Sequence, residues 1–179
     1  MVGTALSYRA FTPFRLQDRQ TSMRVEITSS SPEQTQAIGR VLGTRAQPGD
    51  VVLLVGELGA GKTCLTQGIL WGLGVDEYAR SPTFVMINEY DGRLPLYHID
   101  LYRIEADAEI VDLGLDEYLS GDGVCVVEWP ERSRDAYPVE RVEIKLEHID
   151  ETSRKLTLSS TAQRLDSTLQ AAKSAATAG

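Results

Sequence analysis

The sequence predicts an α/β protein with one core and a central mixed, partly antiparallel sheet, and three observations lead to this prediction. Two apolar runs bounded by turn residues, Val51–Val55 and Val124–Val127, are typical of strands buried on both faces of a sheet. The segment after the first run has helical spacing, as in folds whose helices pack on sheet faces. Near the C-terminus, Val142–Leu146 and Lys155–Leu158 alternate between apolar and polar residues, which indicates edge or antiparallel strands.

The first half of the chain is predicted to fold as strand, helix, strand and helix. Val25–Ile27 alternates as a short strand does, and Ser31 followed by Pro32 is typical of a capped helix start. After the strand Val51–Val55, the segment Lys62–Leu73 is predicted to be a helix that ends at nearby glycines. The apolar stripe of the first helix is expected to consist of Ala37, Ile38, Val41 and Leu42.

The second half is predicted to contain a hairpin and one further helix. Phe84–Tyr90 and Leu94–Ile99 are strand candidates, and the turn sequence Asp91-Gly92-Arg93 joins them. Ala106–Leu119 is expected to be one helix, which the glycines within Gly121–Gly123 end.

The length of 179 residues suits one domain, which we expect to span residues 23–160. Residues 1–22 carry several arginines and one acid, a slight similarity to an organelle transit peptide. We predict instead a short disordered extension, with Met23 opening the folded part. Residues 161–179 are rich in Ala, Ser and Thr and are expected to form a tail, either a frayed helix or disordered.

The composition favours a cytoplasmic protein that does not grip nucleic acid alone. Acidic residues outnumber basic ones by 26 to 18, and no basic run stands out. Unaided binding of nucleic acid usually requires a basic face. Cys64 and Cys125 lie in apolar surroundings, which suggests a reducing compartment. No run of about 18 apolar residues is present, so no membrane span is predicted.

A glycine-rich stretch after the first buried strand matches the phosphate-binding-loop pattern at every fixed position. Its glycines let backbone N–H groups point at phosphate oxygens, and the helix beginning at Lys62 directs its positive dipole end at the same anion. Lys62 adds a charge toward the β and γ phosphates, and the Thr63 hydroxyl can ligate Mg²⁺. The motif therefore predicts binding of a nucleoside triphosphate with magnesium. The residues assigned to this loop are Gly56, Glu57, Leu58, Gly59, Ala60, Gly61, Lys62 and Thr63.

Two carboxylates follow predicted strands and are candidates to hold the metal or its water shell. Glu128 comes directly after the apolar run Val124–Val127, and Asp100 follows the less apolar Leu96–Ile99. The pattern favours Glu128 as the metal-side acid and Asp100 as a second acid or a group that orients water. An ordinary strand-end carboxylate is the alternative for either residue, and the phosphate-binding loop upstream favours the functional interpretation.

Four further residues have both a functional and a structural interpretation. Thr83, which follows Ser81 and a proline, is either a switch-type threonine that contacts the γ-phosphate and metal or a turn residue. Trp129 is either a packing anchor or part of a partner surface. His98 is interpreted as a core histidine rather than a catalytic base, and Cys64 as a small buried residue rather than a nucleophile.

Four motifs together resemble the TsaE family, the small bacterial ATPases of tRNA threonylcarbamoyladenosine biosynthesis. The resemblance covers about residues 23 to 160. The phosphate-binding loop is shared by many families, whereas the motifs around Asp100 and Glu128 are much more specific. The four motifs are Gly-Glu-Leu-Gly-Ala-Gly-Lys-Thr (56–63), Ser-Pro-Thr-Phe (81–84), His-Ile-Asp-Leu-Tyr-Arg (98–103) and Val-Glu-Trp-Pro-Glu-Arg (127–132).

The resemblance implies a P-loop NTPase-like three-layer fold and an ATPase that is not itself a transferase. It implies that Thr63 and Glu128 hold Mg²⁺, with Asp100 as the other functional acid on the metal side. Lys62 and the loop amides would hold the phosphates of ATP. The positions expected to border the adenosine are Pro32, Ser153 and Arg154.

The resemblance also implies partners. TsaE-like proteins bind the TsaB–TsaD pair, in which TsaD transfers the threonylcarbamoyl group to adenosine 37 of tRNAs that read codons beginning with A. ATP binding is expected to support assembly of this complex, and hydrolysis to reset it. Contact with tRNA would be indirect, through the partners, which fits the acidic charge.

Two rival functions use the same loop. A small-molecule kinase would need arginines on a mobile lid, for which Arg132, Arg134 and Arg141 are candidates, but Pro130 and Pro138 leave only a short segment. A nucleotide-gated binding module with negligible turnover is the second rival, and the sequence barely distinguishes it from a slow ATPase.

Overall fold

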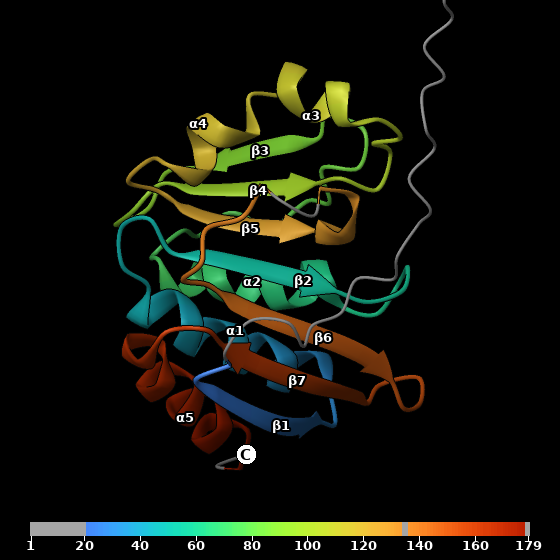
Figure 1. Ribbon diagram of the computed structural model, residues 1–179. Helices are drawn as coiled ribbons and strands as arrows, with labels where there is room; N and C mark the ends of the chain where they lie inside the picture. Colours follow the sequence, from blue (N-terminus) through green and yellow to red (C-terminus); the bar gives the residue numbers. More distant parts are fainter. Residues whose placement is uncertain (1–20, 134–135, 178–179) are drawn as a thin grey trace, which may run out of the picture.

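The computed structural model describes residues 21–133 and 136–177 and has a seven-stranded mixed sheet flanked by helices on both faces (Figure 1). This confirms the predicted α/β class. Most of the predicted extension, residues 1–20, lies outside the described residues. The strands are β1 (Met23–Ser29), β2 (Val51–Val55), β3 (Ile87–Tyr90), β4 (Leu96–Asp100), β5 (Val124–Glu128), β6 (Val142–His148) and β7 (Arg154–Ser160). The helices are α1 (Pro32–Arg45), α2 (Lys62–Gly72), α3 (Asp107–Asp112), α4 (Leu115–Leu119), the 3-10 helix η1 (Pro130–Arg132) and α5 (Gln163–Thr177).

The centre of the sheet is parallel and its margins are antiparallel. The strand order is β1-β7-β6-β2-β5-β4-β3. Within it β6, β2, β5 and β4 pair in parallel, whereas β3 pairs antiparallel with β4, and β7 antiparallel with both β6 and β1. The carboxyl ends of the parallel strands therefore meet at one edge of the sheet, where ligands bind in open α/β folds.

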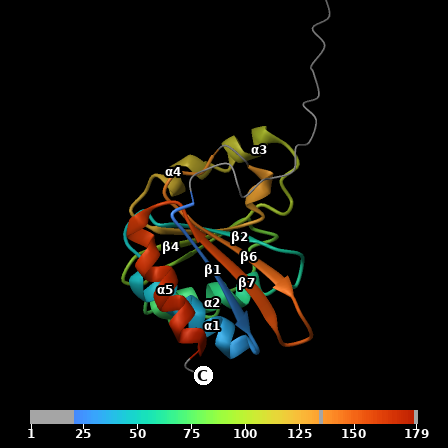
Figure 2. The same cartoon turned by 60° about the horizontal axis from the view of Figure 1, so that its bottom comes forward.

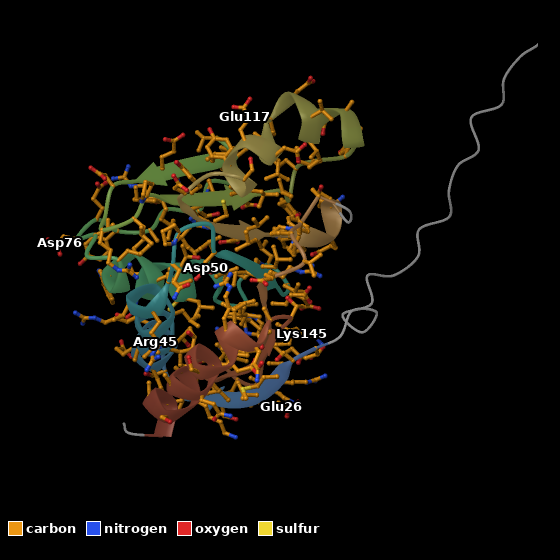
Figure 3. All side chains as sticks on the ribbon, turned by 60° about the vertical axis from the view of Figure 1, so that its left-hand side comes forward. Glu26, Arg45, Asp50, Asp76, Glu117 and Lys145 are labelled. Carbon is orange, nitrogen blue, oxygen red and sulfur yellow. The ribbon has the colours of Figure 1, made fainter. Side chains whose placement is uncertain are left out.

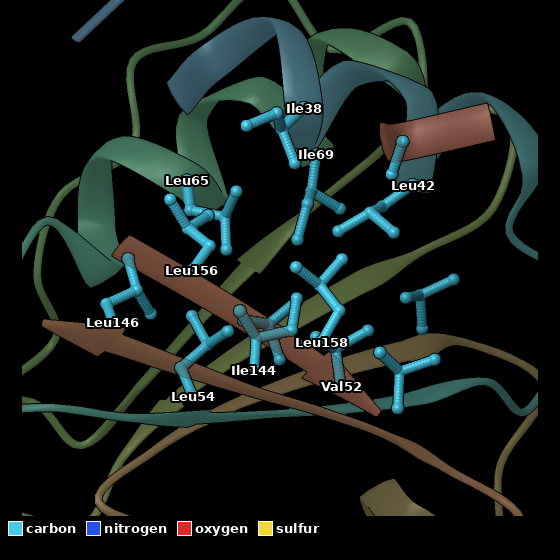
Figure 4. Close-up of a cluster of buried hydrophobic side chains, with 14 of the residues drawn as sticks. Ile38, Leu42, Val52, Leu54, Leu65, Ile69, Ile144, Leu146, Leu156 and Leu158 are labelled. Carbon is cyan, nitrogen blue, oxygen red and sulfur yellow. The ribbon is translucent and has the colours of Figure 1, made fainter. Parts of the chain in front are cut away.

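Each face of the sheet has its own core. α1, α2 and α5 lie on one face and α3 and α4 on the other (Figures 1 and 2). Leu54 of β2 belongs to the first core and its neighbour Leu53 to the second, because successive side chains of a strand point to opposite faces. Figure 4 shows side chains of α1 and α2 meeting those of β2, β6 and β7 in the first core. Charged side chains such as Asp76 and Glu117 are exposed at the periphery (Figure 3).

α1 and α2 touch through their backbones. Gly39 and Gly43 of α1 face Gly68 and Gly72 of α2, and a Cβ added at any of them would lie 2.0–2.3 Å from a backbone oxygen of the other helix. Only glycine permits this approach. The crossing therefore determines where α2 stands over the sheet, and with it the first turn of α2, which carries Lys62.

The predicted strand at Phe84–Tyr90 is only half correct. β3 begins at Ile87, and the residues before it form a turn in which the Met86 N–H donates to the Pro82 carbonyl at 2.6 Å. Met86 has a left-handed backbone, with φ of 67°. The turn leaves Phe84 81% exposed, so this apolar residue does not contribute to the core.

Two helical predictions also need correction. The expected helix at Ala106–Leu119 is two short helices, α3 and α4, separated by Gly114 with φ of 68°. Ala37 of the expected apolar stripe is exposed, while Ile38 and Leu42 are buried. The chain after Thr161, for which a frayed helix or disorder was expected, forms the helix α5, which packs against α1 and β1. Its buried side chains are Leu165, Leu169 and Ala172.

Candidate functional site

The loop between β2 and α2 has the backbone that its glycines predict. Gly59 and Gly61 adopt left-handed conformations, with φ of 77° and 104°, and Gly61 is the N-cap of α2. No side chain caps this helix. The N–H groups of its first turn and the positive end of its dipole are thus available to an anion.

Lys62 turns back over the loop. Its ammonium donates to the carbonyls of Gly56 at 2.8 Å and Glu57 at 3.0 Å and lies 4.3 Å above the ring of Trp129. Only 4% of the residue is exposed. Burial lowers the pKa of Lys62, and the nearby carboxylate of Glu128 partly offsets this effect.

Asp100 and Glu128 stand side by side below α2. They are paired in the register of β4 and β5, on the face of the sheet that α2 covers, and are 2% and 3% exposed. The Thr63 hydroxyl donates to Glu128 Oε1 at 3.1 Å. Parallel pairing of two strands thus brings both predicted acids to one edge of the sheet, beside the start of the helix.

The segment before β3 reaches the same place. The Thr83 hydroxyl donates to Asp100 Oδ2 at 2.6 Å, and Ser81 shares a 2.7 Å hydrogen bond with Thr83. The other oxygen of Asp100, Oδ1, accepts from the Tyr102 N–H at 2.9 Å. Asp100 therefore holds together the segment containing Thr83 and the turn that follows β4.

These elements enclose a pocket of about 250 Å³. Of the predicted site residues it brings together most of the loop, Thr83 and both acids, and Ser81 and Tyr102 join them without having been predicted. The sequence could have indicated Tyr102, because a residue two positions after Asp100 can donate its backbone N–H to that carboxylate. The lining residues are Leu58, Gly59, Gly61, Lys62, Thr63, Cys64, Ser81, Thr83, Asp100, Tyr102, Glu128 and Trp129.

The residues expected to border the adenosine do not line this pocket. Arg154 braces the loop, with Nε donating to the Ala60 carbonyl at 3.0 Å. The Pro32 carbonyl accepts a 3.5 Å contact from the thiol of Cys64, and Ser153 belongs to the exposed turn between β6 and β7. Cys64 is half-buried, not buried as expected, because it faces the pocket.

His98 and Trp129 each contact the site. His98 is wholly buried, as expected of a core residue, but its Nε2 lies 2.9 Å from Glu128 Oε1. Trp129, with φ of 58°, packs its ring 5.0 Å from that of Tyr102. Trp129 is thus a packing residue at the pocket wall as well as the partner of the Lys62 ammonium.

The donor set can be tested against a divalent metal ion. No group of three or more His, Cys, Asp or Glu residues gathers into a metal cluster anywhere in the described chain. The hard oxygens that do converge are the hydroxyl of Thr63 and the carboxylates of Glu128 and Asp100. This set suits Mg²⁺, which takes one or two protein carboxylates and completes its octahedron with phosphate oxygens and water.

A buried parallel strand, a glycine-rich loop, a helix and two acids at neighbouring strand ends define a P-loop NTPase-like α/β protein. The family model described as threonylcarbamoyl adenosine biosynthesis protein TsaE matches residues 29–156. The chain belongs to the TsaE family, and therefore to tRNA threonylcarbamoyladenosine biosynthesis.

Individual relatives agree with this assignment. The tRNA threonylcarbamoyladenosine biosynthesis protein TsaE of Bacillus subtilis is 46% identical over 137 residues, which cover 76% of this chain and 85% of that protein. The TsaE of Treponema pallidum is 42% identical over 130 residues, covering 73% and 96%. The crystal structure of Bacillus subtilis YdiB superposes with a TM-score of 0.73 at 36% identity, covering 87% of this chain and 97% of that one. In the part of the chain that the structure describes, no helix is long and apolar enough to cross a membrane.

Proposed function

We propose that this chain binds ATP with Mg²⁺ in the pocket and hydrolyses it slowly, as an accessory protein of a TsaB–TsaD-type transferase pair. The product of that pair would be threonylcarbamoyladenosine at position 37 of tRNAs that read codons beginning with A. One observation carries the nucleotide part of the proposal. The uncapped start of α2, the Lys62 ammonium and the Thr63–Glu128 pair converge on a single pocket.

Each residue has a role that follows from its hydrogen bonds. The loop N–H groups and Lys62 hold the phosphates. Because the Thr63 hydroxyl gives its only proton to Glu128, its lone pairs are free to ligate the metal. When bound, Mg²⁺ would neutralise charge on the β and γ phosphates. Burial lowers the pKa of Lys62, and the negative charge of a bound phosphate would raise it again, as the nearby carboxylates already do in part.

Asp100 is better suited to holding a segment than to acting as a base. Each oxygen of its carboxylate accepts a hydrogen bond, Oδ2 from the hydroxyl of Thr83 at 2.6 Å and Oδ1 from the N–H of Tyr102 at 2.9 Å, and the Ser81 hydroxyl lies 3.3 Å from Oδ2. A base must have a lone pair directed at the proton it accepts. We therefore assign Asp100 the task of keeping Thr83 beside the γ-phosphate position.

Two features support a helper role over that of a kinase. The Arg141 guanidinium is buried in an ion pair with Glu143, at 2.6 Å, so it does not belong to an open lid, and Arg132 Nη1 contacts the Ile104 carbonyl at 3.4 Å. Arg134, the third lid candidate, lies outside the described residues. Exposed apolar side chains beside the pocket, Leu58 and Phe84, are of the kind that partner proteins cover.

The test is ATP hydrolysis by the full chain, alone and with a purified TsaB–TsaD pair. We expect slow turnover alone and a clear increase with the pair, lost in Lys62→Ala. Equal rates with and without the pair would contradict the accessory role. Consumption of ATP that depends on an added nucleoside or small metabolite would instead identify a kinase.

A further inference from the structure

His98 is a buried polar residue that packing alone does not explain. It is 0% exposed on β4, on the same face as Asp100 and α2. Its Nε2 lies 2.9 Å from Glu128 Oε1, while its Nδ1 is buried and has no hydrogen-bond partner among the described residues. An apolar side chain of similar size would fill this space without leaving a polar atom unsatisfied. The imidazole is therefore best explained by the contact between its Nε2 and Glu128.

The two nitrogens identify the tautomer. A carboxylate only accepts hydrogen bonds, so Nε2 must carry the proton that is donated to Glu128. A proton on Nδ1 would be buried without an acceptor. The neutral Nε2–H imidazole is thus the form that fits these surroundings.

The bond from His98 determines how the Glu128 carboxylate is turned. Oε1 receives two donors, the imidazole of His98 and the hydroxyl of Thr63, at 2.9 and 3.1 Å. No described residue donates to the other oxygen, Oε2, and Glu128 lines the pocket. Because both donors hold Oε1, the carboxylate of the flexible Glu128 side chain cannot rotate freely, and Oε2 stays available to a ligand in the pocket.

We propose that His98 is a positioning residue, which orients Glu128 so that the carboxylate and Thr63 together present oxygens to Mg²⁺. This inference rests on the proposed function, because it assumes that the pocket takes a nucleotide with magnesium. Partners that orient a metal ligand commonly alter metal affinity about 10- to 100-fold when they are removed.

Two substitutions separate this role from simple core filling. In His98→Gln, the amide nitrogen is as many bonds from Cα as Nε2 of histidine, so a donor to Glu128 is retained. In His98→Asn, the amide nitrogen is one bond nearer and matches Nδ1, so the donor is lost although the side chain stays polar. The readout is the dissociation constant of a non-hydrolysable ATP analogue, measured by calorimetry in EDTA and in saturating Mg²⁺.

We expect Mg²⁺ to tighten binding in the wild type and in His98→Gln, and this enhancement to fall about 10-fold or more in His98→Asn. Affinity in EDTA should be the same for all three, because the phosphate-binding loop is unchanged. A His98→Asn protein with the wild-type Mg²⁺ enhancement would overturn the proposal. Absence of analogue binding to the wild type would instead refute the proposed function.

A second measurement needs no variant. Nitrogen-15 NMR of the full wild-type chain distinguishes the two neutral tautomers of a histidine. The Nε2–H form is expected, with a signal that shifts when Mg²⁺ and the analogue are added. An Nδ1–H form would overturn the inference even if both substituted proteins failed to fold.

Discussion

Replacing Gly68 with alanine should weaken the fold and the nucleotide site together, because Gly68 is where α2 touches α1. An added Cβ would lie 2.0 Å from the Gln36 carbonyl oxygen, whereas ordinary contacts begin at 3.4 Å. The obstructing atom belongs to the backbone of α1 and cannot rotate away. The two helices would have to separate by about 1.4 Å, the difference between these distances.

Two opposing effects determine how far Gly68→Ala lowers the free energy of unfolding. Alanine is favoured over glycine inside a helix by about 1 kcal/mol. Overpacking a close contact costs about 1–3 kcal/mol, occasionally more, and a clash between two backbones belongs at the upper end. We expect the free energy of unfolding to fall by about 2 kcal/mol, which corresponds to a Tm lower by about 4–8 °C for a chain of this size.

Urea unfolding of the wild type, Gly68→Ala and Gly121→Ala tests this prediction. Gly121 is the matched control, because its nearest atom to an added Cβ is 3.4 Å away. Its substitution should change stability by no more than about 0.5 kcal/mol. Gly68→Ala should also bind the ATP analogue more weakly, since α2 carries Lys62 and Thr63. Equal stability of the two variants would refute the steric argument.

Three further predictions concern the site and a buried thiol. Lys62→Ala should weaken nucleotide binding about 100-fold by removing a charged phosphate contact. Lys155→Ala, the control, removes a surface ion pair with Glu26 and should leave nucleotide binding unchanged. Calorimetry measures the dissociation constant of the ATP analogue for both variants. Thr83→Val removes the donor to Asp100 and should slow hydrolysis about 10-fold or more with little change in affinity; an unchanged rate would make Thr83 a turn residue only. Burial raises the pKa of Cys125 from about 9 to about 12. As pH rises, the thiol therefore ionises at a lower pH in the unfolded chain than in the folded one. The free energy of unfolding should therefore fall by up to about 1.4 kcal/mol per pH unit between pH 9 and 12. Cys125→Ala should show a shallower fall in urea titrations, and parallel pH profiles would contradict this assignment.

Several elements followed from local physics and could be predicted from the sequence. Ser31 does cap α1, accepting from the Gln34 N–H, with Pro32 at the first helical position. The apolar runs of β2 and β5 are buried as expected. These features depend on residues within one turn or strand of each other, so their signals are contiguous in the chain.

The failures have tertiary causes. The Met86 carbonyl accepts from the Asp100 N–H at 2.9 Å, so β4 helps to hold a turn that the sequence reads as strand. The close crossing of α1 and α2 does have a sequence pattern, which was not used for prediction. Glycines recur four residues apart in both helices, at Gly39 and Gly43 and at Gly68 and Gly72. Without knowing which helices meet, nothing distinguishes these glycines from ordinary ones.

The sequence by itself determined the phosphate-binding loop and the presence of an acid after each of two strands. That these acids are neighbours, and that both stand beneath α2, was decided only by the strand order and the parallel register of β4 and β5. The same pairing brings His98 to Glu128, while the antiparallel pairing of β3 with β4 and the turn before β3 bring Thr83 to Asp100. Register and strand order arise from packing between segments far apart in the chain, whereas the loop needs only its own glycines and the strand and helix on either side of it.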